Sequence, residues 1–408
     1  MPTSSRTPAP RPRARRGATI ALRFALYLGA AWGLVLLLAR GLPGWLPAIV
    51  AGEALYTLLP LFLFLKWRGW PFYPSAPFRL FVVRPALYAQ LLLPIVAGAG
   101  LVGLVVGAPF GHALGVGRTL AAAAFAIGAL VLFAGYLGSR ALRVRETVAH
   151  VPDLPREFDG LRIVQISDVH IGPHTPSGFL HRVVRAVEEL RPDVVAVTGD
   201  LVDDRPEDVA AYARALGGLR APRGVFLIPG NHDVYAGWDA VERDLRRLTD
   251  ATVLVNESHV LHEGRARLAL VGLGDPAGGG ARSGGASRVA PDVERAFARV
   301  PEGVPVVAFA HNPALWPRLA EHGAALTLSG HTHWGQLALP RLGWSLASPF
   351  LEHAMGAYRS GDALLFIHPG TGYWGIPFRL GALPEVTAIV LRTASEAALV
   401  VGERRRAA

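Results

Sequence analysis

The sequence predicts a protein of two parts: an N-terminal membrane region of four transmembrane helices, followed by a layered α/β domain. Apolar stretches of about 20 residues dominate the first third of the chain. After about residue 147, short β-branched runs alternate with amphipathic helical stretches. Charge divides the chain at the same place, because residues 1–145 carry 15 Lys and Arg and one acid, whereas the rest carries 26 bases and 30 acids.

Composition excludes several classes of protein. A chain of 408 residues that is 51% hydrophobic is too long for one ordinary domain and too apolar to be soluble throughout. The absence of cysteine excludes disulfides, thiolate metal sites and a cysteine nucleophile, so a bound metal needs imidazole, carboxylate or amide ligands. The positive charge resides in the membrane part, and the acidic balance of the α/β part argues against a nucleic-acid partner.

Four apolar stretches are long enough to cross a hydrocarbon layer of about 30 Å as helices. They follow a basic tail over residues 1–18 and lie at about 19–39, 42–65, 86–109 and 119–139, so that the membrane region ends near residue 145. A secretion signal is the alternative interpretation of the first stretch, because arginines precede it. No clear cleavage site follows and three more stretches come after it, so we expect a retained anchor.

Lysines and arginines in the loops predict the orientation, because short loops rich in these residues stay in the cytoplasm. The tail, the loop between the second and third stretches, and the exit from the fourth hold most of them, whereas the two alternate loops hold Arg40 and Arg118. We therefore expect a multi-pass protein of the cell membrane with its α/β domain on the cytoplasmic side.

The elements of the α/β domain follow in order from the pattern of apolar residues. Predicted strands cover residues 161–167, 193–198, 224–229, 251–255, a hairpin at 260–271, 304–310, 325–329 and 363–368. Predicted helices cover residues 176–190, 206–217, 238–249, 291–299 and 313–321. Residues 278–287 are low in complexity and predict a loop. The domain is expected to span residues 146–402, before a basic tail at 403–408.

Polar clusters stand just beyond the carboxyl ends of five predicted strands, the edge at which open α/β sheets bind ligands. Glycines in these clusters let the backbone turn sharply, so that the next side chain points into a shared site. Single members occur by chance in many proteins, but five clusters in order predict a metal site. Carboxylates, an amide and imidazoles suit Mn, Fe or Zn better than an all-oxygen Ca or Mg cage. The clusters are Asp168 and His170; Asp200 and Asp203; Asn231, His232 and Asp233; His311; and His331 and His333.

This constellation resembles the calcineurin-like metallophosphoesterase superfamily over residues of about 150–393, and within it the bacterial YkuE and YaeI type of membrane phosphodiesterase. The resemblance rests on LPREFDGLRIVQISDVHIG near the start of the domain, GHTHWGQ, and GTGYWGIPFRLGALPEVTAIVL near its end. It implies a layered α/β/β/α sandwich, two divalent metal ions (Mn, Fe or Zn), hydrolysis of a phosphate ester, and a bacterial inner membrane as the location.

The resemblance also implies a role for each matching residue. His232 is the histidine that protonates the leaving group or stabilises the phosphoryl oxygens, and Asp233 orients its ring. Asp200 bridges the two metals. The remaining ligands are Asp168, His170 and His333 for one metal, and Asn231, His311 and His331 for the other. Asp203 is expected to support the ligands through hydrogen bonds.

Two departures from the pattern bear on substrate. The residues after Asp203 and the sequence GNHD differ from the protein phosphatases of the superfamily, which disfavours a phosphoprotein substrate. Trp334 occupies a position where relatives often have glycine, and we expect it to wall the site or to contact substrate.

The leading hypothesis is a membrane-anchored phosphoesterase that uses two cations, bridged by a carboxylate, to activate a water for attack on phosphorus. A lipid-linked phosphodiester or diphosphate is the expected substrate, because four spans exceed what a tether requires. The resemblance implies, as one example, a substrate like UDP-2,3-diacylglucosamine. One alternative is a general phosphodiesterase for soluble substrates that is merely tethered. Another is a transporter or sensor with an inactive phosphoesterase domain, against which the intact ligand set argues, and a third is a nuclease, which the charge disfavours.

Overall fold

The computed structural model describes residues 13–40, 52, 76–172, 175, 176, 178–279 and 287–406. The chain divides into two compact units, residues 1–133 and 134–408. The helices of the N-terminal part are α1 (Arg13–Ala39), α4 (Ala76–Phe78), a π-helical stretch (Arg79–Val83), α5 (Arg84–Gly107), a 3₁₀ turn (Ala108–Phe110) and α6 (Ala113–Gly138).

Two helical stretches among the described residues are long and apolar enough to cross a membrane, Arg79–Phe110 and Ala113–Gly138. They contain the third and fourth predicted spans. The first predicted span lies in α1, of which Ala25–Ala39 forms a shorter apolar helix. The second, at 42–65, lies outside the described residues apart from Gly52. Among the described residues, two of the four predicted spans therefore coincide with candidate spans.

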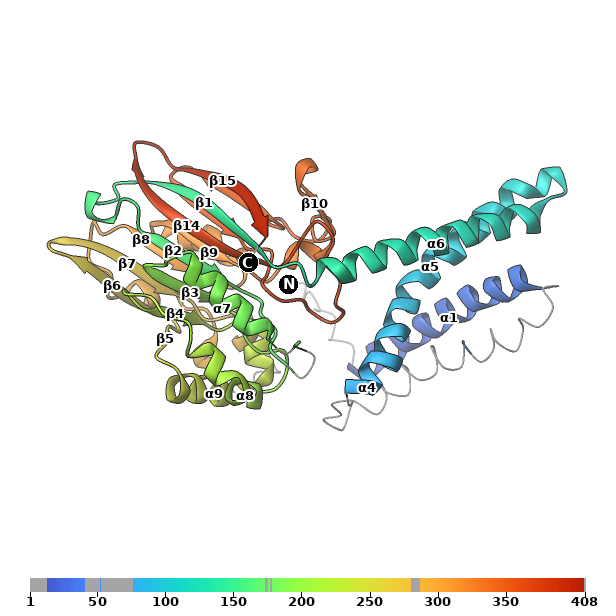
Figure 1. Ribbon diagram of the computed structural model, residues 1–408, viewed down its shortest axis with the longest axis horizontal. Helices are drawn as coiled ribbons and strands as arrows, with labels where there is room; N and C mark the ends of the chain where they lie inside the picture. The colour runs from blue at the N-terminus through green and yellow to red at the C-terminus, as the bar shows by residue number, and fades with distance from the viewer. Residues whose placement is uncertain are drawn as a thin grey trace, which may run out of the picture. The chain divides into compact units, whose positions relative to one another are not determined.

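The C-terminal unit contains a mixed seven-stranded sheet in the order β15-β1-β14-β2-β3-β4-β5 (Figure 1). Strands β2, β3 and β4 run parallel to one another, and β14 lies antiparallel to β2. The bounds are β1 (Arg143–Pro152), β2 (Arg162–Ile166), β3 (Val194–Thr198), β4 (Val225–Ile228), β5 (Thr252–Val253), β14 (Glu385–Ala394) and β15 (Ala398–Arg406).

A second sheet has six strands in the order β12-β13-β9-β8-β7-β6, with β7, β8 and β9 parallel. Strands β10 (Ala338–Leu339) and β11 (Trp344–Ser345) pair outside both large sheets. The bounds of the six strands are β6 (Glu257–Glu263), β7 (Ala266–Gly272), β8 (Val306–Phe309), β9 (Ala324–Ser329), β12 (Gly356–Ser360) and β13 (Ala363–Ile367).

The two sheets pack face to face around a fully buried apolar core to which Ile163, Phe226, Phe309 and Phe366 belong. Helices α7 (Phe179–Glu189), α8 (Glu207–Leu216) and α9 (Asn231–Leu248) pack their apolar faces on the seven-stranded sheet. Helices α10 (Val293–Phe297) and α11 (Trp316–Glu321) pack on the six-stranded sheet. These four layers confirm the predicted α/β/β/α sandwich.

The predicted strands and helices of the C-terminal unit are present, most within three residues at each end. Helix α9 is kinked at Gly237 (φ 106°), and the part after the kink begins at residue 238, as predicted. The part before the kink was not predicted; Asp233 caps its start by accepting the main-chain N–H of Gly230 (2.9 Å). Strands β1, β12, β14 and β15 were not among the predicted elements. Residues 280–286, most of the low-complexity loop, lie outside the described residues.

The carboxyl ends of β2, β3 and β4 meet those of β8 and β9 at one edge of the sandwich. Gln165, at the end of β2, joins the two sheets there. Its Nε2 donates to Oγ1 of Thr198 (2.8 Å) on β3 and to the main-chain oxygen of Ser329 (3.0 Å) on β9. The loops that follow these five strands are therefore held close together.

Candidate metal centre

The five loops bring seven carboxylate and imidazole side chains into one cluster. Within each of three overlapping groups, the potential ligand atoms lie within 4.8 Å of one another. The groups are Asp168, His170 and His333; His170, Asp200 and His232; and Asp200, His311 and His331. Every histidine and aspartate predicted as a ligand is thus in the cluster.

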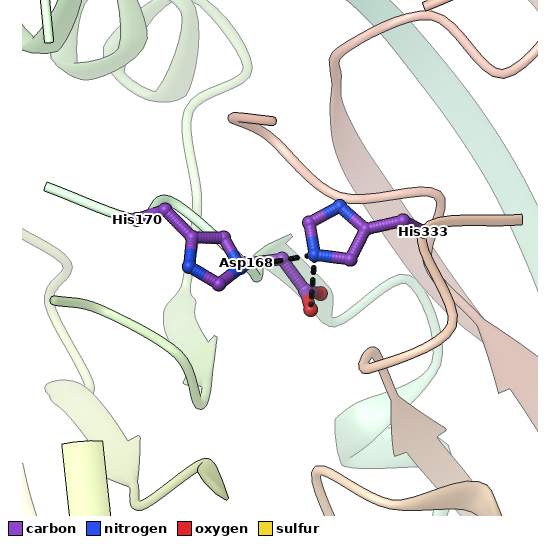
Figure 2. Close-up of side chains that lie close together, drawn as sticks. All are labelled: Asp168, His170 and His333. Atoms are coloured by element: carbon purple, nitrogen blue, oxygen red, sulfur yellow. Dashed lines mark hydrogen bonds and ion pairs between the residues drawn. The ribbon is translucent and has the colours of Figure 1, made fainter. Parts of the chain in front are cut away.

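The first group is buried, and Figure 2 shows its three side chains close together. Nε2 of His333 lies 2.9 Å from Nε2 of His170 and 3.3 Å from Oδ1 of Asp168. Asp168 and His170 are at most 1% exposed. Two imidazole nitrogens and a carboxylate oxygen therefore face one point, an arrangement that a divalent cation would satisfy.

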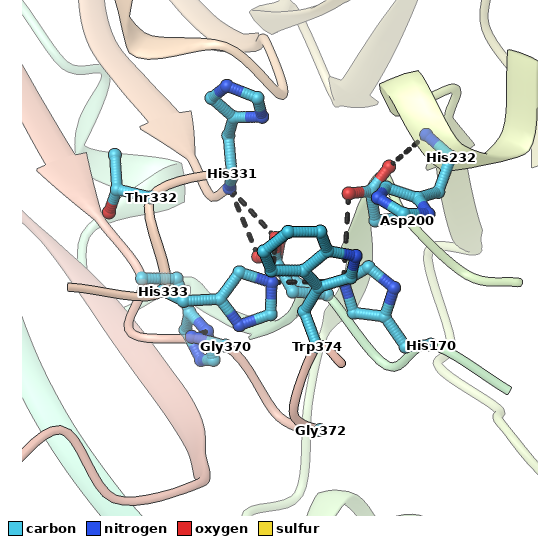
Figure 3. Close-up of polar contacts among 12 residues, drawn as sticks. His170, Asp200, His232, His331, Thr332, His333, Gly370, Gly372 and Trp374 are labelled. Atoms are coloured by element: carbon cyan, nitrogen blue, oxygen red, sulfur yellow. Dashed lines mark hydrogen bonds and ion pairs between the residues drawn. The ribbon is translucent and has the colours of Figure 1, made fainter. Parts of the chain in front are cut away.

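Asp200 belongs to both the second and the third group, and Figure 3 shows it beside His170 and His232. Its Oδ2 is 3.2 Å from Nε2 of His311 and 3.7 Å from Nε2 of His170. Its Oδ1 accepts the main-chain N–H of His232 at 2.7 Å. One carboxylate oxygen thus faces histidines of both groups, which is the position that a bridging ligand requires.

Asn231 tests whether a second cation fits. Its Oδ1 is buried and has no hydrogen-bond partner among the described residues, although a buried amide oxygen without a partner is costly. Asn231 adjoins His232, whose ring belongs to the group around Asp200. A cation on the side of His311 and His331 would supply the missing partner, so the residues present fit two divalent ions.

The backbone at the ligands is strained. Five of the seven predicted ligands have left-handed φ values between 48° and 69°, a region that costs a residue with a side chain about 1–2 kcal/mol. Main-chain hydrogen bonds hold this geometry: the N–H of His170 donates to Asp200 O (3.1 Å), and that of His331 donates to the Asp168 carboxylate (3.0 Å). The five are Asp168, His170, Asp200, His331 and His333.

Glycines before the ligands serve two purposes. Gly199 has a φ of 88°, so it makes the sharp turn that the sequence predicts before Asp200. Gly230 has an extended backbone, and its purpose is space, because a Cβ there would overlap the Asp200 carboxylate. A residue with a side chain at position 230 would displace the Asp200 carboxylate from the cluster.

The charged groups of the cluster shift one another's pKa values. Burial would raise the pKa of Asp200, but the neighbouring His311 and His170 hold it below its usual value. Burial, together with the charge of His311, lowers the pKa of His331 to about 4. An ionised bridging carboxylate and a neutral histidine are the protonation states that bind metal.

His232 is more exposed than the first group, and its ring is oriented by Asp203. Nδ1 of His232 lies 2.6 Å from the main-chain oxygen of Asp203 and 3.5 Å from its Oδ1. The same Oδ1 is 3.3 Å from Nδ1 of His170, so Asp203 supports two rings, as the sequence predicts for a second-layer residue.

Asp233 takes a different position from the one expected. Its two oxygens accept the main-chain N–H groups of Val202 (3.0 Å) and Gly230 (2.9 Å). It therefore fixes the start of α9 and the loop after β3, and the orienting contact that the sequence analysis assigns to Asp233 is made by Asp203.

Two buried charged residues at the site were not predicted as site residues. Arg379 is fully buried; its Nη2 lies 2.6 Å from Nδ1 of His333, and its Nη1 donates to His333 O (3.0 Å). Asp275 follows β7 and is 2% exposed, and burial raises its pKa to about 6. A Gly-Asp pair after a strand is the signal that also marks Asp200, whereas no sequence pattern marks Arg379.

Aromatic residues at the site divide into core and rim. Trp334 is 2% exposed, and its Nε1 donates to Ile367 O (3.0 Å), so it belongs to the core and not to the substrate-contacting wall that we expected. Trp374 is 54% exposed, and its ring lies 6.1 Å from that of His232 (Figure 3). The ring of Tyr235 lies 5.8 Å from that of His232. Trp374 and Tyr235 therefore both adjoin the catalytic histidine candidate.

Comparison with known proteins gives a consistent set of relatives. A family model described as calcineurin-like phosphoesterase matches residues 161–335. An uncharacterized metallophosphoesterase of Helicobacter pylori is 33% identical over 264 residues, which cover 64% of this chain and 67% of the relative. The uncharacterized metallophosphoesterase YkuE of Bacillus subtilis is 29% identical over 67% of this chain and 94% of its own length.

Two further relatives have names that describe location or activity. The "transmembrane protein with metallophosphoesterase domain" of Danio rerio is 34% identical over 60% of this chain, and the match spans 56% of that protein. The UDP-2,3-diacylglucosamine pyrophosphatase LpxG of Chlamydia trachomatis is 28% identical over 60% of this chain and 87% of its own length.

Proposed function

The chain belongs to the calcineurin-like phosphoesterase family and is a metal-dependent phosphoester hydrolase that takes two divalent ions, and on this premise we propose that it hydrolyses a lipid-linked phosphodiester or diphosphate at a membrane. The observation that carries the two-metal part is the Asp200 carboxylate, whose Oδ2 faces His311 on one side and His170 on the other. The proposed site consists of the seven ligands, His232, Asp203 beside the His232 ring, and Asp233 at the start of α9.

When bound, the two ions lower the pKa of a water and neutralise the phosphoryl oxygens. His232 moves the proton. Its Nδ1 donates to the main-chain oxygen of Asp203, which leaves Nε2 to carry the proton for the leaving-group oxygen. Oδ1 of Asp203 also lies 3.5 Å from Nδ1 of His232. Enclosure of Asp168 and His170 excludes water from one side of the cluster and strengthens its electrostatic interactions.

Two observations support a membrane-linked substrate. Stretches Arg79–Phe110 and Ala113–Gly138 are candidate spans, and only residues 139–142 separate the second from β1. The Chlamydia relative is named for a substrate with acyl chains. A substrate that stays in the bilayer would reach such a short-tethered site by diffusion in two dimensions.

The substrate proposal is tested by kinetics with metal-loaded full-length protein in vesicles. We expect hydrolysis of a generic soluble diester, and a kcat/KM at least about tenfold higher for a matched diester or diphosphate that carries acyl chains. Equal efficiency on the two would overturn the lipid proposal and leave a tethered general phosphodiesterase. Failure to hydrolyse either, in protein shown to contain both ions, would overturn the activity itself.

We also propose a multi-pass inner-membrane location with the catalytic domain in the cytoplasm, on the strength of the arginine distribution. A reporter that is active only outside the cytoplasm should be silent when fused after Ala408. The same reporter fused at Gly111, in the turn between the candidate spans, should be active. Activity at the C-terminus would reverse the proposed orientation.

A further inference from the structure

Exposed apolar side chains gather in one surface lobe of the C-terminal unit, residues 337–351, which we call the β10–β11 lobe. Leu342 is 75% exposed and Phe350 80%. A soluble surface rarely concentrates apolar residues in this way unless they meet a partner or a membrane. The exposed large apolar residues of the lobe are Leu339, Leu342, Trp344, Leu346, Phe350 and Leu351.

The charge of the lobe differs from that of the rest of the domain. Residues 337–351 contain no acidic residue and one base, Arg341, which is exposed near the tip. The domain as a whole carries more acids than bases. A surface of leucine, phenylalanine and tryptophan with a single arginine is complementary to a bilayer that has anionic headgroups.

The base of the lobe is fixed to the segment 378–382, which we call the strap. The N–H of Ala338 donates to Leu380 O, and the N–H of Leu380 donates to Gln336 O, both at 2.9 Å. Gly335 lies under the lobe, because a Cβ there would come within 2.5 Å of the Ala347 nitrogen. The lobe is therefore a supported projection and not a free loop.

The strap also holds the last turn of α6. The N–H of Arg379 donates to Gly135 O at 2.8 Å, and a Cβ on Gly138 would overlap the carbonyl oxygen of Arg379. Phe378 packs where a side chain on Gly135 would stand. Because α6 is a candidate span, neighbouring residues of the strap contact the end of a membrane helix and the base of the apolar lobe.

The lobe is continuous with the rim of the metal centre. Gln336 Nε2 donates to Trp374 O, and the N–H of Trp374 donates to Gln336 Oε1, both at 3.0 Å. The ring of Trp374 lies 6.1 Å from that of His232 (Figure 3). One connected set of contacts thus leads from the lobe to the reacting side of the cluster.

We propose that the β10–β11 lobe enters the headgroup and upper acyl layer of the bilayer and so places the rim of the metal centre at the lipid surface. Leu342 and Phe350 enter the acyl layer, while Trp344 and Arg341 lie at headgroup level, where tryptophan and arginine are stable. The inference rests on the membrane location proposed above and deepens it by naming the surface that meets lipid.

The absence of cysteine allows a direct test on the full-length chain. Phe350→Cys is labelled with a nitroxide in vesicles of phosphatidylcholine and phosphatidylglycerol. The matched control is Arg265→Cys, at an exposed position in the turn between β6 and β7. We expect the Phe350 label to collide more with oxygen than with a water-soluble nickel chelate, and the Arg265 label to show the reverse. Equal access of the chelate to both labels would overturn the proposal.

This measurement needs no turnover, so it succeeds or fails independently of the proposed hydrolysis. A strong spin–spin interaction between Phe350 labels on two copies, with the chelate excluded, would also overturn the proposal, because a second copy would then cover the lobe.

A kinetic experiment measures whether the lobe increases kcat/KM for a substrate in the bilayer. The double variant Leu342→Ser and Phe350→Ser should lower kcat/KM on a vesicle-borne lipid diester by about tenfold or more and leave that on a soluble diester unchanged. The control pair Val400→Ser and Val401→Ser, exposed on β15, should change neither value. Equal losses on both substrates in the lobe variant would contradict a lipid-contacting role.

Discussion

Asp168, His170 and His333 lie beneath the surface of the domain, whereas Asn231, His232 and His331 are partly exposed on the other side of the same cluster. Asp200 faces both sides. The enclosed side is suited to hold an ion that does not exchange ligands, and the open side is suited to meet a substrate. Similar ligand chemistry thus supports two different tasks, and burial is what separates them.

The residues behind the ligands differ in the same way. On the open side, the histidine rings form hydrogen bonds with main-chain oxygens. Nδ1 of His311 lies 2.8 Å from Thr198 O, and Nδ1 of His232 lies 2.6 Å from Asp203 O. Behind the enclosed side, the guanidinium of Arg379 meets Nδ1 of His333. A fixed positive charge would therefore stand behind an ion on the enclosed side, where the carboxylate of Asp168 would offset it.

The largest expected effect comes from the residue that joins the two sides. Asp200→Ala should lower kcat/KM on a generic phosphodiester by on the order of 10³-fold or more, since it removes electrostatic stabilisation on both sides at once. Metal analysis should show loss from both positions. The control Asp239→Ala, an exposed acid that pairs with Arg288, should retain both ions and full activity. Two tightly bound ions in Asp200→Ala protein would refute the bridge.

His232→Ala should be the second largest effect and should separate proton transfer from metal binding. Its expected cost is about 10²-fold in kcat, the lower range for loss of a general acid. Metal content should stay near that of the unmodified protein, because His232 is not one of the seven proposed ligands. Metal loss as severe as that of Asp200→Ala would show that His232 is a ligand.

Arg379→Lys should have the smallest effect and should act on the enclosed side alone. Lysine keeps the positive charge but lacks the planar fork that contacts His333, Pro369 and Gly372, so it isolates positioning from charge. We expect the affinity for one ion to fall by about 10- to 100-fold in a chelator titration, with kcat at saturating metal nearly retained. The control is Arg392→Lys, an exposed pair with Asp159. An unchanged chelator midpoint would remove Arg379 from the metal centre.

The ligand cluster could be predicted because its polar residues directly follow the predicted strands. Each ligand follows a buried apolar run by a few residues, and parallel strands bring their carboxyl ends together. The sequence neighbours His232 and Asp233 illustrate the limit. Adjacent residues of a helix do not face each other, so Asp233 accepts main-chain N–H groups at the start of the helix. The ring of His232 is instead contacted by Asp203, which lies 29 residues before His232 in the chain.

Other features could not be predicted for physical reasons. Arg379 is 46 residues from His333 in a segment without regular structure, and arginine is usually exposed, so no pattern marks a buried one. Strand β1 contains Arg143, Arg145 and Glu146, and in the sequence these charges are typical of the end of a transmembrane helix. Only the fold shows that the segment is a strand, because β14 and β15 pair on either side of it. Such partners lie more than 230 residues away along the chain.

The contact between the strap and the last turn of α6 limits where the chain can be truncated or its anchor replaced. A truncation that begins at about residue 147 would remove the first residues of β1 and the helix turn on which Phe378 and Arg379 rest. A soluble enzyme fragment should therefore start at Ala134, inside the membrane helix and not after it. For the same reason a substituted anchor needs glycine at both positions, since a side chain at 135 would displace Phe378 and one at 138 would displace Arg379, which contacts His333.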